Sequence, residues 1–371
     1  MESSVLFRSS DGAIVVIDIP RSLEEAQVLP GQSVPRRIVS TQPVETPWQV
    51  PESKKKDTAN NNASHSAAIA ELMTLERVTA ALETVRTNHG GPWGLPRVTR
   101  ARVSRSESTN LESPATNPDG DGDADTTSSR PKRKRKSPAR AEDGDTTLSE
   151  KPFIPEESHH ILGSIESQRE VFLRDSPLSV FDLIVLDPPW PSRSDTTVYN
   201  IEEARNLLNQ IPVASQLKRN GLVAIWITNK SAIQDLLTAP GGVFAQWGLE
   251  PIGEWIWVKI TTAGEPVLDV HSAWRKPWER LLIARVKGSN TLIPSTKVIL
   301  GVPDVHSRKP NLRGLFEDIL PAGYLGLEVF ARNLTAGWWS WGNEVLFFQQ
   351  PHHWVAIEEE KGEEEESGVS R

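Results

Sequence analysis

The chain of 371 residues contains no cysteine. This absence excludes disulfide bonds, zinc or iron–sulfur sites with Cys ligands, and a cysteine nucleophile. Among enzymes that modify nucleic acids, it disfavours methylation of a cytosine ring carbon, which requires a thiolate. No stretch approaches the roughly 18 apolar residues that a membrane helix needs. The first residues carry Arg8, Asp11 and Asp18 and do not form a signal peptide. We therefore expect a soluble, intracellular protein.

Apolar residues are scarce as well, at 37% of the chain, while proline occurs 28 times. A globular chain of this length usually has more apolar residues, so disordered parts are expected. The net charge of −8 argues against a uniformly basic nucleic-acid coat but allows a local basic groove. Eleven of the 13 tryptophans lie between Trp190 and Trp354, which places the folded core there. The expected regions are a partly ordered accessory region over 1–100, a disordered linker over 101–150, a folded domain over 151–351, and an acidic disordered tail over 352–371.

Two parts of the accessory region are predicted to fold. Val5–Phe7 and Ala13–Ile19 flank Ser-Asp-Gly, a sequence typical of a β-hairpin. Ser66–Asn88 carries an apolar stripe and ends before two glycines, which predicts an amphipathic helix. We expect both to pack against the core. The alternative is an independent module that binds a partner.

Within the folded domain, predicted strands alternate with predicted helices. The clearest strand, Phe181–Asp187, is apolar almost throughout, as expected for a strand buried on both faces of a sheet. This alternation predicts an α/β fold with a mostly parallel sheet. The other predicted strands are His160–Ile165, Leu222–Thr228, Pro251–Ile260, Arg280–Val286, Val298–Val302, Tyr324–Phe330 and Glu344–Phe348, and the predicted helices are Asn200–Gln210, Lys230–Ala239 and Asn311–Leu320.

The sharpest motif is Asp187-Pro188-Pro189-Trp190, directly after the clearest strand. In open α/β sheets ligands bind beyond the carboxyl ends of strands, so the motif lies at the functional edge. The prolines stiffen the turn and leave their carbonyls free. An Asp side chain and a Pro carbonyl together suit an exocyclic amino group with two hydrogens, and a Trp suits stacking of a flat base. The alternative is an ordinary turn, but the full string from Phe181 to Trp190 is much rarer than Pro-Pro alone.

Residues 181–190 resemble the catalytic signature of the adenine-N6 methyltransferases. These enzymes act on RNA and some DNA, and they include the catalytic subunit of the messenger-RNA adenine-methylation complex. The matching segments occur in the same order as in the family and span about residues 155–350. They are most similar to those of the branch of methyltransferase-like protein four. That branch is associated with small nuclear RNA and with DNA adenine. The other matching segments are 258–261, 275–279, 306–310, 327–333 and 337–345.

This resemblance implies S-adenosyl-L-methionine as methyl donor. It also implies a circularly permuted Rossmann-like methyltransferase sheet with helices on both faces, in which the catalytic strand precedes the cofactor strand. No Gly-x-Gly-x-x-Gly motif precedes Asp187, in agreement with that order. The implied catalytic residues are Asp187, Pro188, Pro189 and Trp190. The implied cofactor contacts are Glu328, Arg332 and Asn333 to the ribose, Asn343 to the adenosine part, and Lys309 to the methionine carboxylate.

One position departs from the family pattern. Family members commonly carry an acidic residue on the strand before the catalytic one, near the amino group of the cofactor. Ser164 stands at that place here, and Glu166 is the nearest acidic substitute.

Two basic clusters flank the predicted site and include aromatic residues. Cations interleaved with aromatics suit phosphates and unstacked bases, and a target adenine must leave any stack to react. An ordinary solvated face is the alternative, since the domain carries almost balanced charge. The expected nucleic-acid contacts are Arg275, Lys276, Trp278 and Arg308.

The basic run Lys132–Lys136 lies in the predicted linker and is typical of a nuclear import signal. It predicts nuclear localisation and an import receptor as partner, with a nucleic-acid arm as the alternative. The eight histidines have no partners at metal-ligand spacing, so no metal site is expected.

Together these features predict a nuclear N6-adenine methyltransferase that acts on RNA or DNA. Two alternatives stay open. One is a non-catalytic, nucleic-acid-binding scaffold subunit, although such subunits typically lack the Asp of the signature. The other is methyl transfer to a different amine, such as protein glutamine or cytosine N4. The sequence predicts neither the choice between RNA and DNA nor the oligomeric state.

Overall fold

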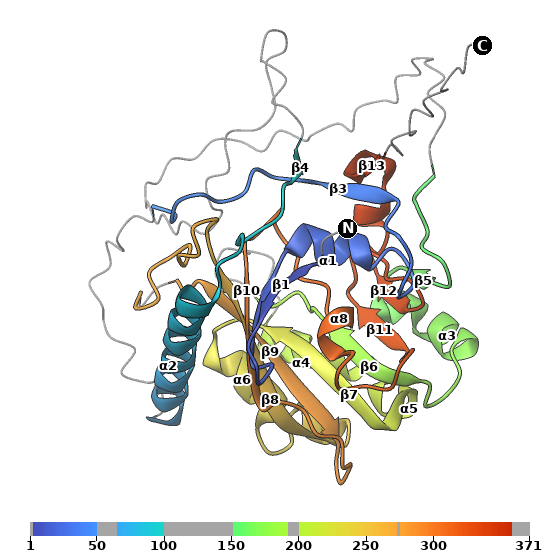
Figure 1. The fold of residues 1–371 in the computed structure, drawn as a ribbon. Coiled ribbons are helices and arrows are strands. Elements are labelled where there is room, and N and C mark those ends of the chain that lie inside the picture. Colours follow the sequence, from blue (N-terminus) through green and yellow to red (C-terminus); the bar gives the residue numbers. More distant parts are fainter. Residues whose placement is uncertain (1–2, 50–64, 100–150, 192–199, 273–274, 358–371) are drawn as a thin grey trace, which may run out of the picture.

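The computed structural model describes residues 3–49, 65–99, 151–191, 200–272 and 275–357. A ten-stranded sheet forms its centre (Figure 1). In spatial order its strands are β1 (Val5–Arg8), β2 (Ile14–Ile17), β10 (Thr296–Gly301), β8 (Leu249–Lys259), β9 (Trp278–Val286), β7 (Leu217–Ile227), β6 (Phe181–Leu186), β11 (Gly326–Val329), β12 (Trp339–Gly342) and β5 (His159–Leu162). Strand β9 runs antiparallel to both neighbours and β1 runs antiparallel to β2, while the other neighbours are parallel. The predicted mostly parallel α/β sheet is therefore confirmed.

Helices cover both faces of this sheet, as predicted. One face packs against α2 (His65–Asn88), α3 (Ile165–Asp175), α4 (Ile201–Asn209), α5 (Val213–Gln216), α6 (Ser231–Thr238) and α7 (Val243–Gln246). The other face packs against α1 (Ile19–Glu25) and α8 (Arg313–Phe316). None of the helices in the described ranges is long and apolar enough to cross a membrane.

Strand β6 shows why an apolar run becomes a central strand. All six of its residues are buried. Ile184 and Leu186 join the core on the face of α3–α7, whereas Leu183 and Val185 join the core beneath α1 and α8. Successive side chains of a strand point to opposite faces, so a strand buried on both sides must be apolar at nearly every position.

The predicted hairpin and helix of the N-terminal region pack against the main core. Strand β2 pairs with β10 and so extends the central sheet. Val78, Leu82 and Val85 of α2 are buried in a cluster that also contains residues of β8 and β10. Leu72, which shares their predicted stripe, is instead exposed. This arrangement favours the core-packing interpretation over an independent module.

A small second sheet corrects one predicted boundary. It consists of β13 (Trp354–Ala356), β3 (Arg36–Ser40) and β4 (Val98–Thr99). The tail predicted to begin at 352 therefore starts with ordered chain, because Trp354 is a buried anchor that follows the short 3-10 helix η2 (Pro351–His353). The linker over 101–150 and residues 358–371 lie outside the described residues.

Three element predictions in the folded domain are wrong. Ile165, placed at the end of a strand, begins α3, whose N-cap is Ser164. The helix expected over Asn311–Leu320 covers only α8, which contains Gly314 and is followed by turns. Glu344–Phe348 is not a strand but leads into the 3-10 helix η1 (Phe347–Gln349). The last strand of the central sheet is the tryptophan-rich β12.

Candidate active site

A pocket opens at the carboxyl edge of the parallel strands, where β6, β7 and β11 end. Its walls include Trp226 of β7, Asn311 in the segment after β10, and Leu23 of α1. Five residues that the sequence assigned to catalysis or cofactor binding line this same pocket, namely Asp187, Lys309, Glu328, Arg332 and Asn333. The fold thus brings together side chains from the catalytic strand and from the cofactor strand.

Lys309 joins two carboxylates beside the pocket. Its Nζ lies 2.6 Å from Oδ2 of Asp187 and 3.5 Å from Oε2 of Glu279. On the other side of Glu279, Nζ of Lys259 lies 2.7 Å from Oε1. We call these four residues the active-site ion-pair chain, because their charges alternate from Asp187 to Lys259.

Burial and pairing act in opposite directions on these groups. Burial raises the pKa of Asp187, and the nearby Lys309 ammonium offsets part of that rise. Burial also raises the pKa of Glu279, but Lys309 and Lys259 outweigh it and lower the pKa to about 2. Burial lowers the pKa of Lys309, yet Asp187 and Glu279 leave it above its usual value. Lys309 therefore stays charged at neutral pH and favours the ionised form of Asp187.

Glu328 has a different environment. It lies on β11 beside β6, and no hydrogen bond or ion pair involves its carboxyl among the described residues. Burial and the neighbouring charge of Asp187 raise the pKa of Glu328 to about 7. An acceptor left without a protein partner in a pocket is suited to hydroxyl donors of a ligand.

Two residues of the pocket have strained backbones. Ser307 has φ of 71° and Phe330 has φ of 64°, and both line the pocket. A positive φ is costly for residues with a side chain, and such residues cluster at active sites. Ser307 precedes Lys309 by two residues, and Phe330 precedes Arg332 by two. The strain therefore falls on the two turns that bring cationic side chains to the pocket.

The turn after β6 is fixed at both ends. The amide of Asp187 donates to the carbonyl of Val329 at 3.3 Å, which ties the end of β6 to the end of β11. The indole Nε1 of Trp190 donates to the carbonyl of Trp226 at 2.7 Å. Pro188 is buried and Pro189 is exposed, while the Trp190 ring is half-buried against the core. Trp190 thus has one orientation, set by the neighbouring strand β7.

The predicted cofactor residues Arg332 and Asn343 differ in their position relative to the pocket. Arg332 lines the pocket and also pairs with Glu344, with 2.6 Å between Nη2 and Oε2. Asn343 is exposed and is not among the residues that line the pocket. The backbone directly before Asn343 nevertheless packs closely against the turn after β11. A Cβ on Gly342 would lie only 2.8 Å from the carbonyl oxygen of Ala331. A side chain at 342 would push the two turns apart.

Comparison with known proteins agrees with this geometry. A sequence model of the MT-A70 family matches residues 181–344. The chain is also similar to the N6-methyladenosine RNA methyltransferase MTA1 of Cryphonectria parasitica, with 42% identity over 95% of this chain and 94% of that protein. The chain belongs to the MT-A70 family.

Two further MT-A70 relatives differ in how much of the chain they match. MTA1 of Pyricularia oryzae is 42% identical over 96% of this chain and 98% of its own length. The N(6)-adenine-specific methyltransferase METTL4 of Homo sapiens is 34% identical over 57% of this chain and 47% of its own length. The similarity to the MTA1 proteins therefore extends through the N-terminal region, whereas the similarity to METTL4 covers little more than half of the chain.

The structure corrects the predicted nucleic-acid contacts. Arg308 is buried, donates to Asp304 and to the carbonyl of Val39, both at 2.8 Å, and packs over the ring of Phe348. Trp278 is buried in the cluster beneath α2. Neither side chain presents a surface to a nucleic acid, because each fills a place in the core.

The other two predicted nucleic-acid contacts are half-buried rather than free on the surface. Nζ of Lys276 lies 2.7 Å from Oε1 of Glu71 in α2 and also packs over the ring of Trp278. Arg275 is half-buried as well. A role of these two residues in binding nucleic acid stays a prediction.

Ser164 and Glu166 both lie at the start of helix α3. Ser164 uses its hydroxyl to cap α3, accepting a hydrogen bond from the amide of Ser167 at 3.0 Å. Glu166 is exposed in the first turn of α3. Neither lines the pocket. A capping hydroxyl and an acidic first turn both stabilise a helix, which explains these residue types locally.

Glu279 and Lys259 were not predicted from the sequence as residues of the site. Both lie in segments that carried the family resemblance, but neither was given a role. Because β9 runs antiparallel to its neighbours, its beginning lies at the same edge as the carboxyl ends of β6 and β7. Recognition of β9 as the reversed strand would have placed Glu279 in the site. No group of three or more His, Asp or Glu side chains that could hold a metal occurs among the described residues.

Proposed function

We propose that this chain transfers the methyl group of S-adenosyl-L-methionine to N6 of adenine in RNA. The observation that carries the proposal is the pocket at the carboxyl edge, where Asp187, Lys309 and Glu328 meet. Methyl transfer to adenine N6 with this donor agrees with membership of the MT-A70 family. The choice of RNA rests on the two MTA1 relatives, which match nearly the whole chain and are named as RNA methyltransferases.

The pocket fits the methyl donor chemically. Glu328 offers an acceptor without a protein partner, which suits the hydroxyls of a ribose. Asn333 and Arg332 follow on the same turn and add donors at the pocket wall. Lys309 provides a fixed cation for a carboxylate, as in other charge-assisted contacts. When bound, S-adenosyl-L-methionine supplies an electrophilic methyl group on a sulfonium.

The residues of the chain position the acceptor. The lone pair of the adenine amino group is delocalised into the ring, so it must be made available for attack. We infer that the free oxygen of Asp187 and the carbonyl of Pro188 accept its two hydrogens. Lys309 offsets part of the rise that burial causes in the pKa of Asp187 and so favours the ionised, accepting form. With S-adenosyl-L-methionine bound, N6 would gain the methyl carbon, the electron pair of the broken carbon–sulfur bond would stay with sulfur, and N6 would lose one of its two protons to the Asp187 carboxylate or to water. Positioning and electrostatics supply most of the acceleration.

Mass spectrometry of nucleosides tests the proposal. Purified full-length protein is incubated separately with RNA and with DNA of the same sequence, each in the presence of S-adenosyl-L-methionine. We expect N6-methyladenosine in the RNA digest and far less N6-methyldeoxyadenosine in the DNA digest. The reverse ratio would overturn the choice of RNA. Methylation of neither substrate would favour the non-catalytic scaffold, and methylcytosine would point to a different amine.

We also propose that the protein acts in the nucleus. The support is the basic run Lys132–Lys136, which follows a proline and lies in a segment with almost no aliphatic residues. An import receptor that recognises basic peptides would be its partner. This run lies outside the described residues, so the support comes from the sequence alone.

A further inference from the structure

We infer that the N-terminal region holds the segment that carries Lys309, and that Arg97 acts through Asp304 as a positioning residue for methyl transfer. The inference rests on the proposed function. It concerns the loop between β10 and α8, residues 302–312, which includes Ser307, Lys309 and Asn311 of the pocket. The residues proposed to hold this loop lie in α1, in β3 and next to β4. All of them are outside the part of the chain that the family model matches.

Arg97 reaches the start of this loop from the segment before β4. Its guanidinium donates to the carbonyl of Val302 at 2.9 Å and to the carbonyl of Pro303 at 3.0 Å. It also lies 3.6 Å from Oδ1 of Asp304. The side chain is only 3% exposed, so these contacts are made away from water. One side chain thus binds three consecutive residues of the loop.

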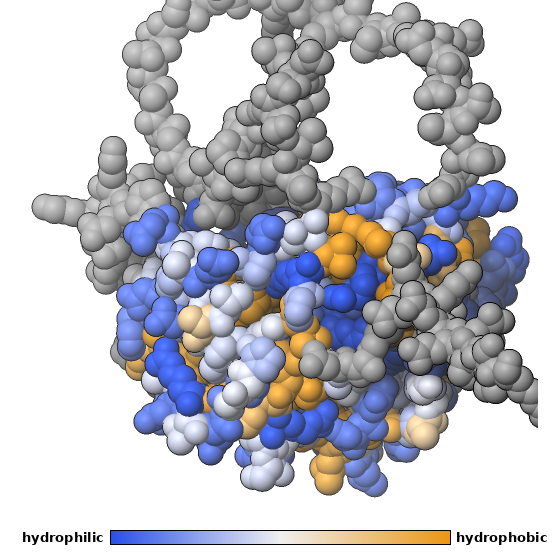
Figure 2. Space-filling model, turned by 45° about the horizontal axis from the view of Figure 1, so that its top comes forward, coloured by the Kyte–Doolittle hydropathy of each residue, from blue (hydrophilic) through white to orange (hydrophobic). Residues whose placement is uncertain are grey.

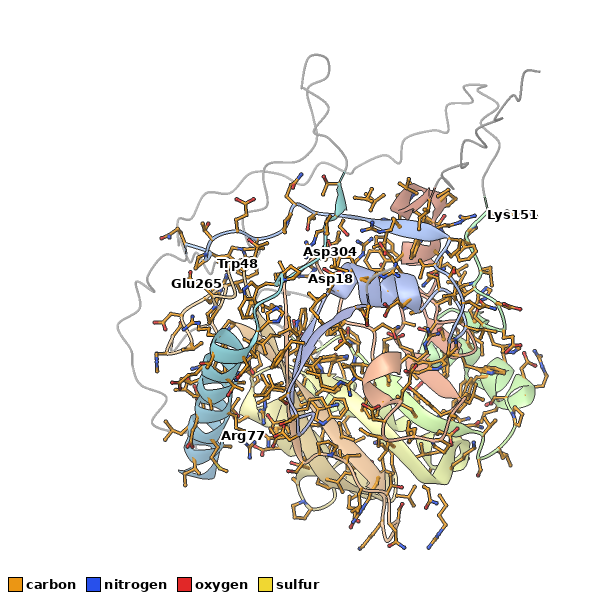
Figure 3. All side chains as sticks on the ribbon, viewed as in Figure 1. Asp18, Trp48, Arg77, Lys151, Glu265 and Asp304 are labelled. Carbon is orange, nitrogen blue, oxygen red and sulfur yellow. The ribbon has the colours of Figure 1, made fainter. Side chains whose placement is uncertain are left out.

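Asp304 gathers donors from several parts of the chain. The amide of Thr41 donates to Oδ1 at 2.9 Å, and the hydroxyl of Ser40 donates to Oδ2 at 3.2 Å. Arg308, four residues further along the loop, donates to Oδ2 at 2.8 Å. The Asp304 side chain is fully buried. Asp18, the N-cap of α1, lies close enough to interact electrostatically with Asp304 and Arg97, and Figure 3 labels Asp18 beside Asp304. We call Asp18, Arg97, Asp304 and Arg308 the buried ion cluster.

The buried ion cluster fixes the backbone position from which the Lys309 side chain extends. Arg308 is held by Asp304, by the carbonyl of Val39 and by the ring of Phe348. Lys309 is the next residue, so its backbone cannot move unless Arg308 moves. Ser307, on the other side of Arg308, has a positive φ that the surroundings must maintain. The reach of Lys309 to Asp187 therefore depends on contacts made by residues 39–41 and 97.

Helix α1 makes a second contact with the same loop. The hydroxyl of Ser22 accepts a hydrogen bond from the amide of Asn311 at 3.1 Å. Leu23, the next residue, forms part of the pocket wall. In Figure 1, α1 and β3 lie above the central sheet in this view. Figure 2 brings this face forward and shows strongly hydrophilic residues beside hydrophobic ones. The N-terminal region is thus one wall of the site as well as an extension of the sheet.

The test compares Arg97→Ala with Arg285→Ala in the full-length protein. Arg285 also pairs with a glutamate, Glu250, and donates to a backbone carbonyl, but it lies at the opposite end of β9 from Glu279. It is therefore a control for the loss of an ion pair on the same fold. Turnover is measured across pH at saturating substrates, and the melting temperature of each variant is recorded. Arg97→Lys tests rescue by a cation with fewer donors.

We expect Arg97→Ala to lower kcat roughly ten- to a hundredfold, because small misplacements at a reacting centre have effects of that size. The acidic limb of the pH profile should also move to higher pH, since Lys309 would favour ionised Asp187 less. The other charged groups near Asp187 are Glu279, Glu328 and Arg332, and none of them is altered. Arg97→Lys should recover part of kcat. Arg285→Ala should keep the wild-type kcat and acidic limb.

Unchanged kcat and an unchanged acidic limb in folded Arg97→Ala would overturn the inference. An equal loss of kcat in Arg285→Ala would do the same, because it would indicate a general effect of stability. If Arg97→Ala does not fold, Ser22→Ala removes the acceptor of the Asn311 amide, together with one hydrogen bond inside α1 to the carbonyl of Ile19, and should lower kcat by several fold. Wild-type kcat in that variant would then count against the inference. Failure of the proposed function is distinct, because the wild-type protein would then produce no N6-methyladenosine.

Discussion

Arg308 and Lys309 follow one another in the chain, yet they belong to charge clusters of different character. Arg308 and Asp304 have side chains that are 1% and 0% exposed. Lys309 and Asp187 remain 17% and 32% exposed and line a pocket. In the buried ion cluster, Asp304 receives donors from backbone amide, hydroxyl and guanidinium groups. In the active-site ion-pair chain, Asp187 accepts from Lys309 at one oxygen.

This difference shows what separates a structural charge from a functional one. A buried carboxylate that already has several donors gains nothing from a ligand and stabilises the fold that surrounds it. Carboxylates with accepting capacity left at a pocket wall, such as Asp187 and Glu328, can bind a substrate or a donor. A basic residue beside aromatics occurs in both clusters, so that sequence pattern does not distinguish them.

The largest expected effect is at Asp187. Asp187→Ala should lower kcat by about 10² to 10³, because it removes an oriented acceptor at the reacting centre. The fold should persist, since Lys309 keeps Glu279 as a partner. Nucleoside mass spectrometry measures turnover, and thermal melting checks the fold. Asp187→Asn, which keeps the shape but not the charge, is the matched control. Near-normal turnover of both variants would remove Asp187 from the site.

Replacement of each of the two neighbouring cations by alanine tests the comparison directly. Arg308→Ala should lower the free energy of unfolding by about 3 kcal/mol, because it leaves Asp304 buried with fewer partners. Lys309→Ala should change stability much less but should lower kcat. Chemical denaturation and initial rates, measured on both variants, give the two quantities. If Lys309→Ala proved the more destabilising of the two, the division into two clusters would be wrong.

Glu328 and Asn343 test the cofactor strand. Glu328→Ala should weaken S-adenosyl-L-methionine binding by roughly 1–3 kcal/mol, because a ribose hydroxyl loses its acceptor. Asn343→Ala should have a smaller effect, because Asn343 is exposed and lies outside the pocket lining. Calorimetric titration measures both affinities. Unchanged affinity in the two variants would mean that the donor binds elsewhere.

Glu328 also gives the protein a pH dependence of stability. Its pKa is raised from 4.5 to about 7 in the folded state, so the folded protein binds more protons than the unfolded one between these values. The contribution of Glu328 to stability should therefore fall as pH rises from about 4.5 to 7, then level off. Glu328→Gln should lose this contribution, on the order of 1 kcal/mol after solvent screening. Urea denaturation at pH 5 and pH 8 gives the change in the free energy of unfolding of each protein between these pH values. An equal change in the wild type and in Glu328→Gln would contradict the raised pKa of Glu328.

The central strands and most of the site were predictable because they follow from local patterns. An apolar run such as β6 must be buried, and Asp187 directly after it must lie at the carboxyl edge. The reversed direction of β9 was not predictable, because a strand buried on both faces is apolar at successive positions whichever way it runs. Glu279 was therefore missed. The burial of Arg308 depends on Val39 and Phe348, which lie far away in the sequence, so no local pattern around it reveals its role.

A third set of charges, Lys132–Lys136, belongs to neither cluster and should have the smallest effect on chemistry. The run is basic, follows a proline and is flanked by Ser, Thr, Gly and Asp, so it has no apolar stripe to bury. A solvated basic segment is accessible to an import receptor, but it could also hold phosphates. Replacement of Lys132–Lys136 by serine should move a tagged protein out of the nucleus and leave turnover on short RNA nearly unchanged. A matched variant in which the shorter basic run Lys54–Lys56 is replaced by serine should keep its location. If instead location holds while RNA affinity and its salt dependence both fall in the first variant, the longer run binds nucleic acid and the import proposal is wrong.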